Sequence, residues 1–240
     1  MKLSNQDISN ISNILATAAV GGIEALVIDD GVVRGVNEGR TFVIISEHNV
    51  PKLPQKMGLA RLSMLKARLE LFSGNAATVI EAKETERGEI GSLEIVAGRN
   101  KVQFRCTSTA LIKAPKSIND TPAYTIVFSQ EELKLLLSAI KVMAGKTLTL
   151  VIKKDGTVQV SLADATNDAF SSTLEASAEF LIENSDTVVH YYHADVFHAV
   201  MRTTDADPVS IVIGAAGTIN AEVNGHLVVL MPKINEDIEE

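Results

Sequence analysis

Apolar residues recur at helical spacing in four segments of the chain, and shorter β-rich runs fill most of the remainder. Apolar positions separated by three and four residues predict helices over about Asn5 to Ala18, Gly58 to Phe72, Gln130 to Ala144 and Ala194 to Thr203. A glycine follows each of the first three segments, as is typical at the ends of helices. The pattern therefore predicts four amphipathic helices with one buried side each.

The runs between these helices are rich in β-branched and aliphatic residues and predict strands. In the first half they are Ile23 to Ile28, Val32 to Val36, Thr41 to Ile45, Ala76 to Ala82, Ser92 to Val96 and Lys101 to Lys113. In the second half they are Thr147 to Ile152, Thr157 to Leu162, Phe170 to Leu181, Val209 to Ile213, Thr218 to Val223 and His226 to Met231. Asp30-Gly31, Asp155-Gly156 and Asn224-Gly225 are typical hairpin turns, so we expect antiparallel meanders.

The two halves of the sequence repeat one pattern. Ser4 with Asp7 opens the first helix and Ser129 with Glu132 opens the third, and each pair has the spacing of a capping box. Each helix is followed by a strand, an acidic-Gly turn, further strands and a second helix. Pro115 to Pro122 is polar, bracketed by proline and typical of a linker. We expect an α+β fold of two tandem similar domains, residues 1–114 and 123–240, joined by the linker 115–122, each with two helices on an antiparallel sheet.

Composition narrows the possible functions. The chain has 22 Lys and Arg against 30 Asp and Glu, a net charge of −8, which argues against a protein that grips nucleic acid over its whole surface. Aromatic residues are 4% of the chain and Trp is absent, which disfavours carbohydrate platforms and base-stacking surfaces. The single Cys106 excludes an intrachain disulfide. The polar start and the lack of a long apolar run predict a soluble, unprocessed chain without a membrane span.

One short motif suggests nucleotide binding at first sight. Gly145-Lys146-Thr147 resembles the end of a phosphate-binding loop, but Ile140 stands where that motif requires glycine. The motif must also join a strand to a helix, whereas here a helix precedes a strand. We interpret this segment as the C-terminal end of a helix, where the positive charge of Lys146 is favourable.

The candidates for catalysis or metal binding are equally weak. His193 and His198 are i and i+5, a spacing that does not point two ligands the same way on a helix, and His190 lies before them. Asp164 and Asp168 lie in a segment whose composition is typical of a turn. We therefore expect no enzyme and no cofactor, and a small hydrolase that uses His193 or the Asp pair is the weakest alternative.

Basic residues are concentrated on the outer sides of three predicted helices. Lys134 and Lys141 share the side of the third helix opposite its leucines, and His198 and Arg202 share the outer side of the fourth. The second helix carries further basic residues around its apolar stripe. Because the whole chain is acidic, basic helices mean that the acidic residues must lie elsewhere.

A tandem pair of such domains, with basic helices on an acidic chain, resembles the DNA sliding clamps. Gly225 to Leu227 and Met231 to Asp237 are similar to the closing strand and tail of proliferating cell nuclear antigen. Met1 to Ser4 and Leu62 to Leu65 are more similar to the clamps of tailed phages. The resemblance implies a polymerase processivity factor that encircles double-stranded DNA as a homotrimeric ring, with a DNA polymerase and a clamp loader ATPase as partners, in the cytoplasm of a host cell if the protein is viral.

The resemblance also implies three sets of site residues. The residues expected to face DNA are Lys134, Lys141, Arg202 and His198, with Arg61, Lys66, Arg68 and Lys146 in addition. The polymerase peptide is expected to bind beside the linker, near Met231, Pro232, Lys233 and Ile234. The ring is expected to close between the strands Phe104 to Ile112 and Glu175 to Ile182 of neighbouring chains, through Phe104, Thr107, Leu111, Leu174, Phe180 and Ile182.

The main alternative is a scaffold or virion-associated interaction protein built from duplicated sheet domains. In that case the basic residues on the helices would simply be solvated, as is usual for amphipathic helices.

Overall fold

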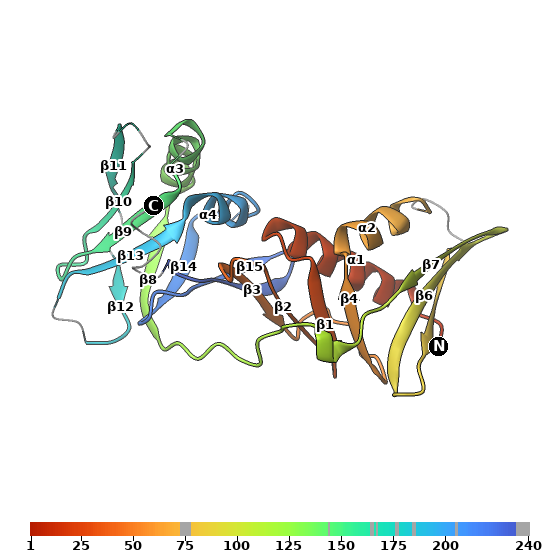
Figure 1. Ribbon diagram of the computed structural model, residues 1–240. Helices are drawn as coiled ribbons and strands as arrows, with labels where there is room; N and C mark the ends of the chain where they lie inside the picture. Colours follow the sequence, from red (N-terminus) through yellow and green to blue (C-terminus); the bar gives the residue numbers. More distant parts are fainter. Residues whose placement is uncertain are drawn as a thin grey trace. The chain divides into compact units, whose positions relative to one another are not determined.

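The computed structural model describes residues 1–72, 78–143, 145–163, 166, 168–175, 178–183, 186–204 and 206–233. The chain divides into two compact units (Figure 1). The first comprises Met1–Ser117 with Asn224–Leu227, and the second comprises Ile118–Val223 with Val228–Glu240.

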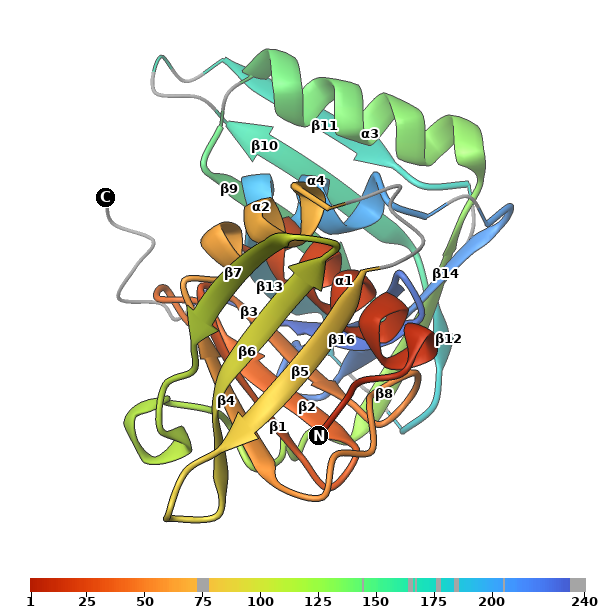
Figure 2. The same ribbon diagram turned by 90° about the vertical axis from the view of Figure 1, so that its right-hand side faces the viewer.

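The first unit places two helices against antiparallel strands. Its elements are α1 (Asn5–Val20), β1 (Ala25–Asp29), β2 (Val32–Val36), β3 (Phe42–Ser46), β4 (Lys56–Ala60), α2 (Leu62–Glu70), β5 (Val79–Glu84), β6 (Glu89–Ala97), β7 (Asn100–Arg105) and the short 3₁₀ helix η1 (Thr109–Leu111). The strands β3, β2, β1 and β4 pair in that order, and β4 then makes a short parallel contact with β6. The strand β6 pairs with β5 on one side and β7 on the other, and the three lie side by side in Figure 2.

The second unit repeats this order of elements. It comprises β8 (Pro122–Phe128), α3 (Gln130–Met143), β9 (Thr147–Ile152), β10 (Val158–Ala163), β11 (Ala169–Thr173), β12 (Glu179–Phe180), β13 (Val188–His193), α4 (Ala194–Met201), β14 (Val209–Gly214) and β15 (Ile219–Val223). The last strand, β16 (His226–Leu230), is divided, since its first two residues belong to the first unit and the rest to the second. The strands β11, β10, β9 and β13 form a four-stranded sheet, while β12, β8, β14 and β15 pair in that order.

The predicted duplication is confirmed in the pairing of the strands. The strand β1 pairs with both β2 and β4, and its counterpart β9 pairs with both β10 and β13. Ser4 with Asp7 and Ser129 with Glu132 form the predicted capping boxes. The fold is therefore α+β with two tandem similar halves, each with two helices on antiparallel sheets.

The core of each unit is aliphatic and follows the predicted helical stripes. Ile11, Ile14 and Leu15 of α1 are buried, as are Leu133 and Leu136 of α3. Burying one such side chain contributes about 1.5 to 3 kcal/mol, so these stripes fix which side of each helix faces the sheet. The opposite side of each helix is left for solvent or for ligands.

The prediction for the second helix was wrong at its start. The helix begins at Leu62, and Gly58 lies in β4, where Met57 and Leu59 are both fully buried. Backbone pairing with β1 on one side and with Thr107 on the other holds this segment extended. The leucine spacing is compatible with a helix over Gly58 to Ala60, but the strand contacts are made with residues far away in the sequence.

Two long predicted strands are also interrupted. The strand expected over Lys101 to Lys113 ends at Arg105. After it, Thr107 pairs with Gly58 of β4 through an isolated bridge, and η1 follows. The strand expected over Phe170 to Leu181 is divided between β11, which pairs with β10, and β12, which pairs with β8 in the other sheet. The strands β4, β8 and β13 were not among the predicted strands.

Candidate nucleic-acid interface

Helix α3 presents a basic stripe to solvent. The capping box at Ser129 begins the helix, and the buried Leu133, Leu136 and Ile140 fix its orientation. Lys134 and Lys141 are consequently exposed on the opposite side, two turns apart. The structure places both as the periodicity predicted.

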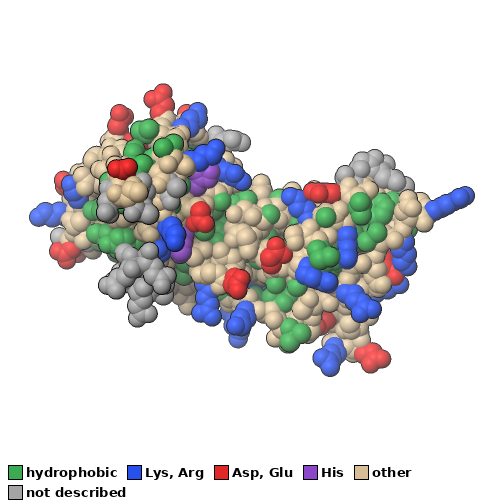
Figure 3. Space-filling view, turned by 45° about the horizontal axis from the view of Figure 1, so that its top comes forward, with side chains coloured by type: hydrophobic (Ala, Val, Ile, Leu, Met, Phe, Trp, Pro, Cys, Tyr) green, Lys and Arg blue, Asp and Glu red, His purple; other side chains and the backbone are tan. Residues whose placement is uncertain are grey.

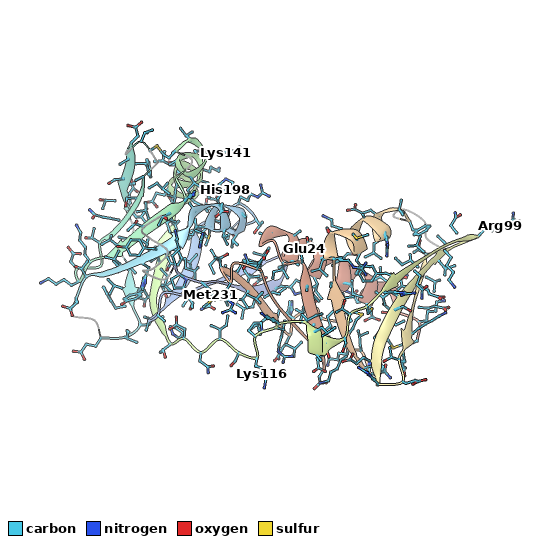
Figure 4. The ribbon with its side chains drawn as sticks, in the orientation of Figure 1. Glu24, Arg99, Lys116, Lys141, His198 and Met231 are labelled. Atoms are coloured by element: carbon cyan, nitrogen blue, oxygen red, sulfur yellow. The ribbon has the colours of Figure 1, made fainter. Side chains whose placement is uncertain are left out.

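Helix α4 adds charge beside this stripe. Burial lowers the pKa of His198, and the positive charges of Arg202 and Lys141 lower the same pKa further. Figure 4 shows Lys141 and His198 on the two neighbouring helices α3 and α4. We call Lys134, Lys141, His198 and Arg202 the α3–α4 basic surface. His198 is mainly neutral there at pH 7, so the two lysines and Arg202 carry its charge.

Lys146 lies at the margin of this surface. Its carbonyl oxygen accepts a hydrogen bond of 3.1 Å from the backbone N–H of Ala194, the first residue of α4. Its side chain is exposed. In Figure 3, the side chains of Lys, Arg and His gather over α3 and α4.

The basic residues of α2 are arranged differently. The guanidinium carbons of Arg61 and Arg68 lie 5.4 Å and 5.5 Å from the centre of the Phe104 ring. Arg61 also donates to the carbonyl oxygen of Arg105 at 3.3 Å, and Arg68 donates to that of Gln103 at 3.1 Å. Both arginines are therefore engaged with β7, whereas Lys66 is exposed on α2.

The first unit also carries an acidic residue that the sequence did not single out. Glu24 is exposed just before β1, and its carboxylate accepts a hydrogen bond of 3.3 Å from the hydroxyl of Ser63 on α2 (Figure 4). Its negative charge lies beside α2 and offsets part of the basic charge of that helix. The α3–α4 basic surface is accordingly the stronger candidate for contact with phosphates.

No protein-family model and no curated protein matches the sequence. The structure, however, is similar to solved structures over nearly its whole length. A chain of the PCNA2–PCNA3 complex of Sulfolobus tokodaii matches with a TM-score of 0.62 at 15% identity, and the match covers 97% of this chain and 99% of that one. PCNA of A. fulgidus, solved with the C-terminal region of FEN-1, matches with a TM-score of 0.61 at 13% identity and covers 98% of both chains.

A bacterial protein provides the third match. The β subunit of DNA polymerase III from Pseudomonas aeruginosa matches with a TM-score of 0.68 at 11% identity. This match covers 98% of the present chain but 66% of that longer one. The chain has the fold of a DNA sliding clamp.

The segment expected to bind partners lies on the second unit of this clamp fold. The N–H of Lys233 donates to the carbonyl oxygen of Tyr191 at 2.8 Å, and its ammonium group donates to the hydroxyl of Thr147 at 2.9 Å. Met231 and Pro232 are partly exposed beside it, and Met231 is labelled in Figure 4. Ile234 lies outside the described residues. These contacts hold Met231 to Lys233 in a defined place against β13 and β9.

The end of the predicted linker is fixed to the same unit. The carboxylate of Asp120 accepts hydrogen bonds from the N–H of Ala216 at 3.0 Å and from the hydroxyl of Thr218 at 2.7 Å. These bonds outweigh the effect of burial and lower the pKa of Asp120. Asp120 is therefore ionised at neutral pH and ties the chain just before β8 to the turn between β14 and β15.

The six residues expected at the subunit interface have very different exposures. Leu111 is 78% exposed and Ile182 is 37% exposed, so both side chains are available to a partner. Phe104 and Leu174 are buried, Phe180 packs against Tyr124 with ring centres 5.7 Å apart, and Thr107 bridges to Gly58. The buried residues can support an interface only through the strands that carry them.

The rejected candidates for catalysis gain nothing from the structure. Gly145-Lys146-Thr147 joins α3 to β9, and His190 is buried between the rings of Tyr124 and Tyr192. Asp164 lies outside the described residues. In the part of the chain that the structure describes, no three His, Cys, Asp or Glu side chains are grouped as metal ligands. Burial raises the pKa of the Cys106 thiol to about 12, which keeps that thiol protonated.

Membrane insertion through a helix also lacks a candidate. Within the described ranges, every helix is too short or too polar to cross a lipid bilayer.

Proposed function

We propose that this protein is a DNA polymerase processivity factor, a sliding clamp that closes around duplex DNA and tethers a replicative polymerase to its template. The observation that carries the proposal is that the clamp fold extends over 97% of the chain and over 99% of a PCNA chain of similar architecture. The α3–α4 basic surface on an acidic chain supports it, because a clamp needs positive charge where it meets DNA and little elsewhere. In this role the protein is not an enzyme.

A clamp of this length would be a homotrimer. The chain covers two PCNA chains almost completely but 66% of the bacterial β subunit. Two domains per chain then require three copies to supply six domains in a closed ring. The native mass in solution is expected to be three times that of one chain.

Ring closure would use two sheet edges of the same chain. In the described part of the structure, β7 pairs with β6 and β11 pairs with β10, and each ends its sheet on the other side. Exposed strand edges of this kind bind further strands readily. We assign the closing contact to β7 of one copy and β11 of the next, in place of the longer strands that the sequence predicted.

The mechanism follows from topology. A closed ring cannot leave the duplex sideways, so its inner surface needs only weak, mobile phosphate contacts that are screened by salt. Lys134, Lys141 and Arg202 would supply these contacts, and they would carry no base specificity. Sliding is then possible because no single contact is strong.

The segment around Met231 to Lys233 would receive partner peptides. The solved structure of A. fulgidus PCNA contains the C-terminal region of FEN-1, which shows that a protein of this fold binds such a segment. For the present chain we propose that the polymerase and the clamp loader ATPase bind there by similar peptides. The likeness of Met1 to Ser4 and Leu62 to Leu65 to the clamps of tailed phages supports a viral clamp acting in the host cytoplasm.

Reversing the charge of Lys134 and Lys141 tests the DNA-facing surface. The Lys134→Glu, Lys141→Glu variant is expected to lose loading onto DNA and stimulation of a polymerase by about tenfold or more, because four charge units change where the duplex passes. Loading is measured by retention on DNA across a range of salt, and assembly by native mass.

The matched control carries the same charge change elsewhere. Lys154 lies at the Asp155-Gly156 turn, and Lys52 is exposed near another turn, at Gly31. The Lys52→Glu, Lys154→Glu variant is expected to load normally. Equal loading by both variants at every salt concentration would contradict the assignment of the DNA-facing surface.

A further inference from the structure

The strand β7 has one side turned away from its sheet. Across the β6–β7 pair, the N–H of Cys106 donates to the carbonyl oxygen of Gly91 at 2.9 Å. Backbone groups of alternate residues point in opposite directions along a strand. Those of Val102 and Phe104 therefore point toward β6, and those of Gln103 and Arg105 point outward. An added strand would bind to these outward groups.

The outward carbonyl oxygens of Gln103 and Arg105 are the two that Arg68 and Arg61 occupy. Arg68 reaches the first at 3.1 Å and Arg61 the second at 3.3 Å. Their guanidinium groups also lie over the buried ring of Phe104, between the two outward positions. Arg61, which precedes α2, and Arg68 of α2 thus cover the free edge of β7 without adding any strand.

The backbone conformation of Arg61 also supports a specific role for its side chain at the β7 edge. Arg61 precedes α2 with φ of 58°, a left-handed conformation that residues with a side chain adopt rarely. It makes no side-chain cap for the helix. Its side chain extends to β7 instead, so the strained residue serves the strand edge.

We propose that Arg61 and Arg68 form a releasable cover on the β7 edge, and that the strand which displaces them is β11 of a second copy of this chain. The inference rests on the proposed function, because it assigns a control to the ring-closing contact. It also reassigns the two arginines, which were expected to face DNA. A cover that competes with strand addition would keep the single chain from pairing indiscriminately and would keep the ring easy to open.

The charges around the two edges are complementary. The β7 edge carries Arg61, Arg68 and Arg105, whereas the ammonium group of Lys101 is paired with the carboxylate of Glu94 at 2.7 Å. Asp168 and Glu175 flank β11 in the sequence, and the carboxylate of Glu132 contacts Glu175. The N–H of Glu175 donates to the carboxylate of Glu132 at 2.7 Å, which places the start of α3 next to the end of β11. A basic edge and an acidic edge on one chain favour head-to-tail association of identical copies.

The two edges also match in the number and orientation of their outward backbone groups. The N–H of Leu174 donates to the carbonyl oxygen of Val158 at 2.9 Å, so the backbone groups of Ala169, Ser171 and Thr173 point away from β10. These outward groups can pair with those of Lys101, Gln103 and Arg105. Each strand then offers three outward residues to the other.

The test variant removes the hydrogen-bond donors of Arg61 and Arg68 and keeps a long apolar side chain at each position. In the Arg61→Met, Arg68→Met variant, the side chains still shield Phe104 but cannot donate to the β7 carbonyl oxygens. The control variant, Lys66→Met, Arg99→Met, removes the same charge from α2 and from the tip of the β6–β7 hairpin (Figure 4). Self-association of both is measured by sedimentation velocity over a range of concentrations, with far-UV circular dichroism to check folding.

The cover variant is expected to self-associate about tenfold more tightly than the control variant, because two hydrogen bonds no longer compete with the added strand. Adding Ser171→Pro, which removes an outward N–H of β11, is expected to abolish this gain. If the double variant does not fold, Arg68→Met alone is expected to give a smaller gain in the same direction.

The other outcomes separate the cover from the ring. Association no tighter than the control, with wild-type association still blocked by Ser171→Pro, would overturn the cover and leave the ring standing. A gain that Ser171→Pro does not remove would overturn β11 as the displacing strand. If every variant remained monomeric at all concentrations, both the cover and the proposed ring would be wrong.

Discussion

His190 shows how one buried residue links stability to pH. The residue is 8% exposed, and its Nε2 atom has no hydrogen-bond partner among the described residues. Burial lowers its pKa below the usual 6.5, although the charge of Asp120 raises it in part. The unfolded chain therefore takes up a proton at higher pH than the native protein does. Stability is full above about pH 6.5 and falls as the pH drops through the lower pKa of the folded state.

Replacing His190 by Phe is expected to reduce this pH dependence. Phenylalanine keeps a ring between Tyr124 and Tyr192 but cannot bind a proton. The free energy of unfolding, measured by urea denaturation at pH 7 and pH 5, is expected to fall less in the variant than in the wild type. Part of the decrease is expected to remain, because His198 also has a lowered pKa. Replacing the exposed His48 by Phe is the control, and equal pH dependence of all three proteins would contradict this role.

Among the elements of the first unit, the contact between β4 and the segment that follows β7 depends on one glycine, Gly58. A Cβ atom on Gly58 would lie 2.2 Å from the carbonyl oxygen of Thr107 and 3.0 Å from Ile112. The N–H of Thr107 donates to the carbonyl oxygen of Gly58 at 2.8 Å, so the two backbones cannot separate without losing this bond. Gly58 therefore allows β4, β7 and η1 to meet.

The Gly58→Ala variant is expected to lose about 1 to 3 kcal/mol of unfolding free energy, the usual cost of overpacking. Gly39 provides the control, because a Cβ atom there would lie 3.6 Å from Thr41, at ordinary contact distance. Both variants are compared by thermal and urea unfolding. A loss no larger for Gly58→Ala than for Gly39→Ala would show that the crossing tolerates the extra carbon.

Elements that depend on local signals could be predicted from the sequence. The capping boxes at Ser4 and Ser129 and the Asn224-Gly225 turn lie where residues a few positions apart require them. The extended state of Gly58 could not be predicted, because it depends on β1 and on Thr107. The same limit explains why two predicted strands were too long.

The residues of the candidate site also divide into those that local sequence signals predict and those that depend on contacts with distant parts of the sequence. Lys134 and Lys141 were identified by helical periodicity, and the structure exposes both. Arg61 and Arg68 satisfy the same pattern but lie on Phe104, a contact between distant parts of the sequence. A positive charge on a helix is therefore a candidate for contact with DNA only when no nearby strand or ring engages it.

At the scale of the whole molecule, the net charge of −8 becomes compatible with DNA binding. A protein held on DNA by affinity needs many phosphate contacts, and each adds to the salt dependence of binding. A ring needs few, because it is retained by its closure. In the proposed ring, a small basic surface on α3 and α4 would be sufficient for this mode of retention, while acidic charge elsewhere would limit other contacts with DNA.

Trapping of the protein on a duplex of controlled topology is the most direct test of whether it encircles DNA. A duplex fixed to a bead at one end is incubated with the protein, its free end is then blocked with a bulky group, and the bead is washed at about 1 M salt, where electrostatic contacts are screened. If the protein encircles DNA, it is expected to stay bound only when the end is blocked and to be released when the duplex is cut. Loss in the wash despite blocking, or retention that does not depend on the end, would contradict encirclement.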